Sequence, residues 1–213
     1  MIAMDLPVAR TRVAIVPPVA DDARDVDEAI VVALWGGDRA AAAALFDRHA
    51  PHVRRVLRRI LGPDPETCDL LQDVFVHALR DIRRLRDPRL VGAWLTGIAV
   101  HVARRAIRKR RRWAWIRFFA PESVPDVAAA ERDDVAAEQL AATFRILAEL
   151  PTDERIAFSL RILDGMDLSA LAAACGVSVA TTKRRLQRAV AAFRAAANDD
   201  PALRDRLALG SRA

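Results

Sequence analysis

Apolar side chains recur at helical spacing along most of the chain. The clearest run has apolar residues at the i, i+3, i+4, i+7 and i+8 positions of an amphipathic helix, namely Val53, Val56, Leu57, Ile60 and Leu61. Gly62-Pro63 follows this run directly and predicts its end. Only eight glycines, no tyrosine and long tracts of Ala, Leu, Arg and Val favour helices throughout. The pattern therefore predicts an all-α fold.

Three further helical patterns lie in the first half of the chain. They cover 26–34, closed by Gly36-Gly37, then 71–82, broken by Asp87-Pro88, and finally 95–106. In the second half, residues 138–150 are predicted to form a helix that Pro151 ends. Thr152 or Asp153 is expected to cap the next helix, which runs to about Leu163.

A short helix, a glycine turn and a longer basic helix follow. The short helix covers 169–175 and Gly176 ends it, while Ser178 is expected to cap a long helix. The inside of that helix is expected to carry Val179, Leu186, Ala189, Val190 and Phe193. This order is typical of a helix-turn-helix, although an ordinary helical hairpin gives a similar pattern.

Charge divides the chain into segments. The net charge is +6, and two basic runs without acids, Arg104–Arg112 and 178–197, flank a mostly acidic stretch over 122–138. Two basic surfaces on either side of an acidic connector suggest a polyanion bound at two points, whereas the alternative is a pair of merely solvated faces. With 53% hydrophobic residues, the chain has enough apolar material for a real core.

These shifts predict two small helical domains joined by a flexible linker. The expected segments are a flexible leader over 1–25, an N-terminal domain over 26–119, an acidic linker over 120–137, a C-terminal helix-turn-helix domain over 138–197, and a tail over 198–213.

The helix over 95–106 carries a basic stripe headed by an indole. At about 100° per residue its apolar positions share one arc, and the opposite arc holds Trp94, His101, Arg105, Arg108 and Arg112, with Arg104 at its edge. Arginines at this spacing can follow a phosphate backbone, and an exposed aromatic can stack on an unpaired base. Trp94 could equally be a core residue at the start of the helix.

The order of these segments resembles the extracytoplasmic-function (ECF) sigma factors of bacterial RNA polymerase, over roughly residues 27–197. CDLLQDVFVHAL is similar to the family's polymerase-docking segment, and GAWLTGIAVHVARRAIRKRRR resembles the segment that melts and reads the minus-ten promoter element. The stretch from LAELPTDER to AVAAFR resembles the domain that reads the minus-thirty-five element. The resemblance implies a sigma factor that directs core RNA polymerase to promoter DNA, with a cognate anti-sigma factor as a further partner to expect.

The resemblance also implies roles for individual residues. The residues that match the family's polymerase-docking motif are Asp69, Leu71, Gln72, Asp73 and Phe75. DNA binding falls to Trp94, His101, Arg104, Arg105, Arg108 and Lys109 in one helix, and to Thr181, Lys183, Arg184, Gln187 and Arg188 in the recognition helix. His101 stands where the family often has Asn, and Thr182 stands where an inward apolar residue is usual.

Two other classes of function fit parts of the pattern. A ligand-controlled transcriptional regulator would use Lys183–Arg188 on a duplex operator, but it does not need the second basic surface at Trp94 and Arg104–Arg112. A metal enzyme would need more than His49, His52 and His77, which lack an HExxH motif, so we expect no catalysis, metal or cofactor. Cys68 and Cys175 lie far apart, and no apolar run reaches about 20 residues, so a cytoplasmic protein without membrane insertion is expected.

Overall fold

The computed structural model describes residues 21–117 and 134–204, and these residues form helices without a β-strand. The predicted all-α fold is confirmed. The predicted linker over 120–137 lies largely outside the described residues, as do positions 1–20 of the leader and 205–213 of the tail.

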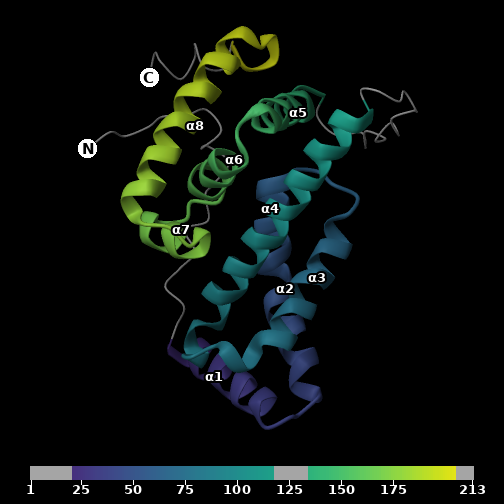
Figure 1. The fold of residues 1–213 in the computed structure, drawn as a ribbon, viewed down its shortest axis with the longest axis vertical. Helices are drawn as coiled ribbons and strands as arrows, with labels where there is room; N and C mark the ends of the chain where they lie inside the picture. The colour runs from purple at the N-terminus through teal and green to yellow at the C-terminus, as the bar shows by residue number, and fades with distance from the viewer. Residues whose placement is uncertain (1–20, 118–133, 205–213) are drawn as a thin grey trace.

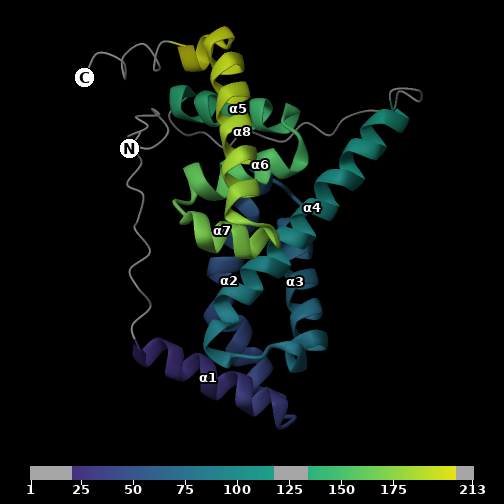
Figure 2. The ribbon, with the colours of Figure 1, turned by 60° about the vertical axis from the view of Figure 1, so that its left-hand side comes forward.

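Four helices build the N-terminal part of the molecule (Figure 1): α1 (Asp21–Trp35), α2 (Ala40–Leu61), α3 (Thr67–Asp81) and α4 (Val91–Arg117). Two short 3-10 turns, Ile82–Arg84 and Pro88–Leu90, join α3 to α4. The latter is capped by Asp87, whose carboxylate accepts a hydrogen bond from the Arg89 amide. In both ribbon views α1 lies across one end of the unit, while α4 runs its whole length (Figures 1 and 2).

The C-terminal part contains α5 (Asp134–Glu149), α6 (Thr152–Phe158), α7 (Leu168–Cys175) and α8 (Val179–Asp199). A π-helical turn, Ser159–Leu163, continues α6. The buried residues Phe158, Leu147 and Phe193 tie three of these helices into one core cluster. The rings of Phe158 and Phe193 stack with their centroids 4.5 Å apart.

Three details differ from the sequence predictions. Helix α1 begins at Asp21 rather than near residue 26, so residues 21–25, predicted as part of a flexible leader, are helical. Helix α6 is preceded by the extended Pro151 and has no side-chain cap, so neither Thr152 nor Asp153 acts as one. Val179 is exposed rather than inside, because it is the first residue of α8.

The two parts of the molecule share a core. Ile156, Ala157, Leu160 and Leu171, from the C-terminal part, belong to the same buried cluster as the apolar faces of α2, α3 and α4. Gly97 lies at the contact between α4 and α7, where a Cβ atom added to it would be 3.8 Å from the carbonyl oxygen of Ala174, an ordinary van der Waals distance. The C-terminal helices are therefore packed directly on the N-terminal ones.

A buried arginine links the two parts through hydrogen bonds. Arg155 of α6 donates from Nε to the carbonyl of Ile60 (2.9 Å) and from Nη2 to the carbonyl of Leu61 (3.0 Å). These carbonyls are at the C-terminal end of α2, where the helix dipole favours a positive charge. Burial lowers the pKa of Arg155 to about 10, which leaves it protonated at neutral pH.

Within the described residues, the stretch Pro88–Trp113 is long and apolar enough to cross a membrane by length and composition alone. Half of its apolar window is buried within the protein, and its other face carries Arg104, Arg105 and Arg108. These features are those of a core helix in a soluble protein.

Candidate nucleic-acid interface

The basic run of α4 divides into paired and unpaired side chains. Arg104 pairs with Asp153, Arg110 with Asp64 and Glu66, and Arg111 donates to the carbonyls of Ala148 and Leu150. Arg105, Arg108, Lys109 and Arg112 are exposed, with no ion-pair partner among the described residues. The unpaired side chains include the three arginines predicted to share the wet arc with Trp94.

Trp94, His101 and Arg105 line one cavity of about 870 Å³. Trp94 is partly buried and packs against the core with part of its ring, while the cavity gives access to the rest. The structure is therefore compatible with both sequence predictions for Trp94, because one side of the indole packs on the core and the other side is accessible from the cavity.

The same cavity contains basic residues that the sequence analysis did not single out. Arg80, Arg84 and Arg86, from the end of α3 and the segment after it, line the cavity together with His77 and with Asp81, whose carboxylate pairs with Arg80 and Arg84. The signal was present in the sequence, because residues 80–89 include five arginines. They lie outside the helical period of residues 95–106, so that pattern did not point to them.

The helix-turn-helix has the expected local geometry. Asp167 caps α7 by accepting from the amides of Ser169 and Ala170, and Ser178 caps α8 by accepting from the amide of Thr181 at 3.2 Å. Gly176 adopts a left-handed conformation with φ of 68°, which favours glycine. Thr182 is buried, and its hydroxyl has a hydrogen-bond partner because it donates to the carbonyl of Ser178 at 3.1 Å.

The predicted recognition residues lie on the accessible side of α8. Lys183, Arg184 and Gln187 are exposed, whereas Thr181 is half-buried and accepts a hydrogen bond from Arg184. Leu186 is half-buried, while Ala189, Val190 and Phe193 are buried as expected.

Two neighbouring acids hold arginines from both basic helices. Asp153 accepts from Arg104 of α4 and from Arg185 of α8, each at 2.9 Å. Glu154 pairs with Arg188 of α8 at 2.9 Å. Two predicted DNA-binding residues, Arg104 and Arg188, are thus paired with the start of α6, a contact that sequence periodicity gave no means of finding.

The predicted docking residues separate into a surface row and buried anchors. Asp69, Gln72 and Asp73 are exposed along α3, and Val76, which the sequence analysis did not include, extends the row with 64% of its surface exposed. Leu71 and Phe75 lie in the core, where Phe75 contacts the ring of Phe46. The outer face of α3 therefore offers two carboxylates beside an apolar side chain.

The histidines do not converge on a metal site. His49 lies 3.0 Å from the carboxylate of Asp27, while His52 contacts Thr96 and Arg55. Burial lowers the pKa of both imidazoles. Among the described residues, no group of three or more His, Cys, Asp or Glu side chains is arranged to hold a metal ion.

Comparisons with known proteins agree with one another on the family of this chain. Residues 45–113 match the family pattern described as Sigma-70 region 2, and residues 141–193 match Sigma-70, region 4. It is 35% identical over 133 residues to the ECF RNA polymerase sigma factor SigC of Mycobacterium tuberculosis (strain CDC 1551 / Oshkosh), covering 62% of this chain and 70% of that protein. The chain belongs to the ECF sigma factors of RNA polymerase.

Other relatives cover more of this sigma factor. It is 27% identical over 178 residues to the ECF RNA polymerase sigma-E factor of Escherichia coli (strain K12), covering 76% of this chain and 90% of that protein. Among solved structures, CnrH in complex with the cytosolic domain of CnrY is similar, with a TM-score of 0.58, 24% identity and coverage of 83% of this chain and 99% of that chain.

A second solved structure shows the same fold. It is the sigma factor RpoE in complex with the anti-sigma factor NepR from Bartonella quintana, with a TM-score of 0.56, 22% identity and coverage of 74% of this chain and 97% of that chain.

This sigma factor therefore directs core RNA polymerase to promoter DNA. Core RNA polymerase and promoter DNA are its partners. Sigma factors are soluble transcription factors and in general are not enzymes. A ligand-controlled operator-binding regulator is not favoured, because both sigma regions match in the family's order.

Proposed function

We propose a division of labour between the two basic helices of this sigma factor. Residues 26–119 form the domain that docks on polymerase and opens the minus-ten element, and residues 138–197 form the domain that reads the minus-thirty-five element. The observation that carries the proposal is the cavity in which Trp94, His101 and Arg105 meet the arginines of the preceding loop.

The chemistry of this cavity suits an opened DNA strand. Opening a duplex costs about 1.4 kcal/mol per base-pair step in lost stacking, and stacking on one aromatic ring returns about 1–3 kcal/mol. Stacking on Trp94 therefore compensates for the free energy of opening one or two base-pair steps. This is enough to nucleate melting but not to complete it. Arg105, Arg108 and Lys109 hold phosphates along the same face, and Arg104 joins them once its ion pair with Asp153 is released.

The recognition helix reads duplex DNA. Thr181, Lys183, Arg184, Gln187 and Arg188 contact base edges and phosphates in the major groove, where an arginine bound to a guanine through two hydrogen bonds contributes about 1–3 kcal/mol of discrimination. The outer face of α3, with Asp69, Gln72 and Asp73, docks on a basic surface of the polymerase. Leu71 and Phe75 act from the core by fixing the position of that face.

Three broader assignments complete the proposal. The protein acts by binding alone, without catalysis, metal or cofactor. It works in the cytoplasm, where polymerase and promoters are. A cognate anti-sigma factor regulates it, which is supported by the solved structures of CnrH and RpoE being complexes with CnrY and with the anti-sigma factor NepR.

Permanganate reactivity of promoter thymines tests the role of Trp94. With holoenzyme containing Trp94→Ala, we expect closed-complex affinity near the wild-type value and slower appearance of reactive thymines. Trp113→Ala is the matched control, because Trp113 is an exposed indole on the same helix outside the cavity. Equal rates of promoter opening for wild type and Trp94→Ala would mean that Trp94 has a purely structural role.

A further inference from the structure

The cavity beside Trp94 holds two of the four histidines of the chain. His77 of α3 and His101 of α4 both line it, and each has an arginine of the cavity one helical turn further along, Arg80 and Arg105 respectively. His101 is exposed and His77 is half-buried. The two imidazoles therefore belong to two cationic rows that border the same accessible space.

The charge of this cavity depends strongly on its histidines. Its other charged side chains are four arginines and two aspartates, so without the histidines the lining carries a charge of +2. They are Arg80, Arg84, Arg86 and Arg105 with Asp81 and Asp87. Helix α7 contributes only the uncharged Ala173. Protonation of both imidazoles would therefore raise the charge of the lining from +2 to +4.

The two aspartates already have partners within the protein. Asp81 pairs with Arg84 at 3.2 Å and with Arg80 at 3.6 Å, and Asp87 accepts a hydrogen bond from the amide of Arg89 at 3.0 Å. In contrast, neither histidine of the cavity has a hydrogen-bond or ion-pair partner in the described part of the chain. Both imidazoles are thus available to a ligand that enters from outside.

Histidine chemistry makes such a ligand sensitive to pH. The charge of an imidazole ordinarily changes between about pH 5 and pH 8. A neutral imidazole offers a phosphate one N–H donor, whereas an imidazolium offers two donors and a positive charge. A bound phosphate therefore stabilises the imidazolium, and by linkage the affinity for phosphate rises as pH falls through this range. Arginine stays protonated throughout, so the arginines add no such dependence.

We propose that binding of an opened DNA strand to this cavity is coupled to proton uptake by His77 and His101, whose imidazolium groups contact phosphodiester groups of the strand. The inference rests on the proposed function of the cavity, and it adds His77 to the residues that contact the strand. The affinity of the sigma factor for an opened strand then increases as the pH falls from about 8 to about 6, a range in which no arginine or aspartate of the cavity titrates.

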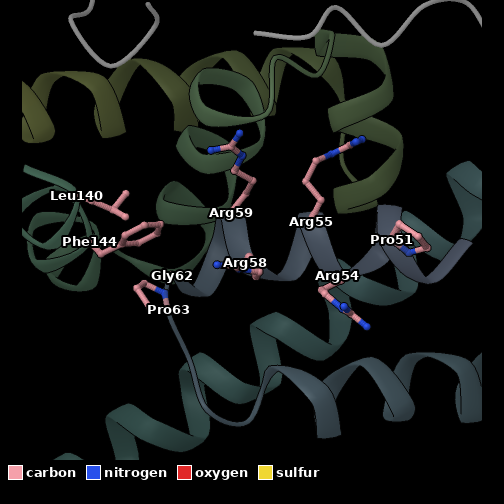
Figure 3. A pocket seen from close by; sticks show the side chains of 9 residues that line it. All are labelled: Pro51, Arg54, Arg55, Arg58, Arg59, Gly62, Pro63, Leu140 and Phe144. Atoms are coloured by element: carbon pink, nitrogen blue, oxygen red, sulfur yellow. The ribbon is translucent and has the colours of Figure 1, made fainter. Parts of the chain in front are cut away.

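A second cationic surface provides a comparison within the same molecule. A groove of about 340 Å³ on the outer side of α2 is lined by Arg54, Arg55, Arg58 and Arg59, and Figure 3 shows these side chains between Pro51 and Phe144. The lining of this groove includes no histidine among the described residues. A strand bound there meets arginines alone, so its affinity should not follow the titration of an imidazole.

Fluorescence anisotropy of the full chain with a rhodamine-labelled ten-nucleotide thymidine strand tests the proposal at about 100 mM salt. Wild-type affinity should rise at least fivefold between about pH 8 and about pH 6, where thymine does not titrate. His77→Gln/His101→Gln should weaken binding at least fivefold at about pH 6 and by a clearly smaller factor at about pH 8, so that its own affinity changes less than twofold between the two.

Two control variants and a second measurement accompany this experiment. His49→Gln/His52→Gln removes the other two histidines of the chain, and Arg54→Ser/Arg58→Ser removes charge from the comparison groove. Both should keep the wild-type dependence on pH. Calorimetry in two buffers of different ionisation enthalpy should show uptake of about one proton per strand at pH 7 by wild type, and close to none by the histidine variant of the cavity. Circular dichroism confirms that each variant is folded.

The outcomes separate this inference from the proposed function. If Arg105→Ala weakens strand binding but wild-type affinity is equal at both pH values, the proposed function stands and the proton coupling is wrong. If neither Trp94→Ala nor Arg105→Ala changes strand affinity, the strand does not bind in the cavity, and both are refuted. An equal loss of affinity at both pH values in His77→Gln/His101→Gln would mean that these histidines are only structural. A pH dependence that survives in this variant, or that either control abolishes, would also overturn the inference.

Discussion

At the scale of single residues, His52 connects protonation to the contact between the domains. Its Nδ1 accepts a hydrogen bond from Arg55 at 3.0 Å, and its Nε2 donates to the hydroxyl of Thr96 at 2.8 Å, which is the pattern of a neutral imidazole. Arg55 in turn donates to Asp164 of the C-terminal part. The groups that face His52 are thus Arg55, Thr96, His49 and Asp164.

Burial, followed by the nearby charge of Arg55, lowers the pKa of His52 below its ordinary value of 6.5. The unfolded chain therefore takes up a proton before the folded chain does, and the stability due to this residue is lost as pH falls below about 6.5. Replacing His52 by Gln, whose amide can make both hydrogen bonds without titrating, should make stability less dependent on pH, by at most about 1.4 kcal/mol per pH unit. Urea unfolding between pH 7.5 and 5.5 measures this, and parallel curves for wild type and variant would contradict it.

At the scale of elements, α3 presents a compact set of side chains to a partner. Asp69, Gln72, Asp73 and Val76 recur at three- and four-residue spacing on its outer face. Such a face combines two charges for orientation with one exposed apolar contact, a combination common in protein interfaces.

Reversing the charge of this face tests its role in docking. Asp69→Lys/Asp73→Lys should reduce binding to core polymerase at least a hundredfold, because attraction to a basic surface becomes repulsion. Asp47→Lys/Asp199→Lys, which makes the same charge change at exposed positions elsewhere, should bind nearly as well as wild type. Gel filtration with core polymerase measures the difference, and circular dichroism checks helicity. Retained binding by the α3 variant would refute the assignment.

Most elements could be predicted from sequence because their signals are local. The apolar period of α2, the break after α3 and the capping of α8 by Ser178 all depend on residues within a few positions of one another. The wet arc of α4 was predictable for the same reason.

Contacts between distant elements could not be predicted in this way. The hydrogen bonds of Arg155 to Ile60 and Leu61 join residues more than ninety positions apart, and the pairing of Asp153 with Arg104 and Arg185 joins three helices. Arg185 resembles its neighbours Lys183 and Arg184 in sequence, yet it is half-buried in an ion pair while they are exposed.

At the scale of the whole molecule, the packed arrangement brings together two helices that are proposed to read distant DNA elements. Arg104 of α4 and Arg185 of α8 contact the same carboxylate of Asp153. The minus-ten and minus-thirty-five elements lie about 25 base pairs apart, which is about 85 Å at 3.4 Å per base pair. The domains must therefore separate before both elements are read at once.

Removing the two acids should favour that separation. Asp153→Asn/Glu154→Gln releases Arg104, Arg185 and Arg188, so the free protein should bind duplex DNA about three- to tenfold more tightly, with a steeper dependence on salt. Asp200→Asn/Glu28→Gln adds the same net charge but removes one ion pair each from Arg145 and Arg89, which lie outside both proposed surfaces. Anisotropy with a labelled duplex between 50 and 200 mM salt measures the effect. An equal gain for both variants would mean that net charge alone is responsible.

The core shared by the two domains also has a consequence during synthesis of the chain. Leu171 completes a buried cluster whose N-terminal members end at Ile107, so about 60 residues must be translated between them. At about 5–20 residues per second this takes roughly 3–12 s. Throughout that interval α4 has left the ribosome without the helix that covers it, and Arg104 has no Asp153 to pair with until residue 153 emerges. A newborn chain therefore exposes the side of its proposed DNA-binding helix that α7 covers in the finished chain.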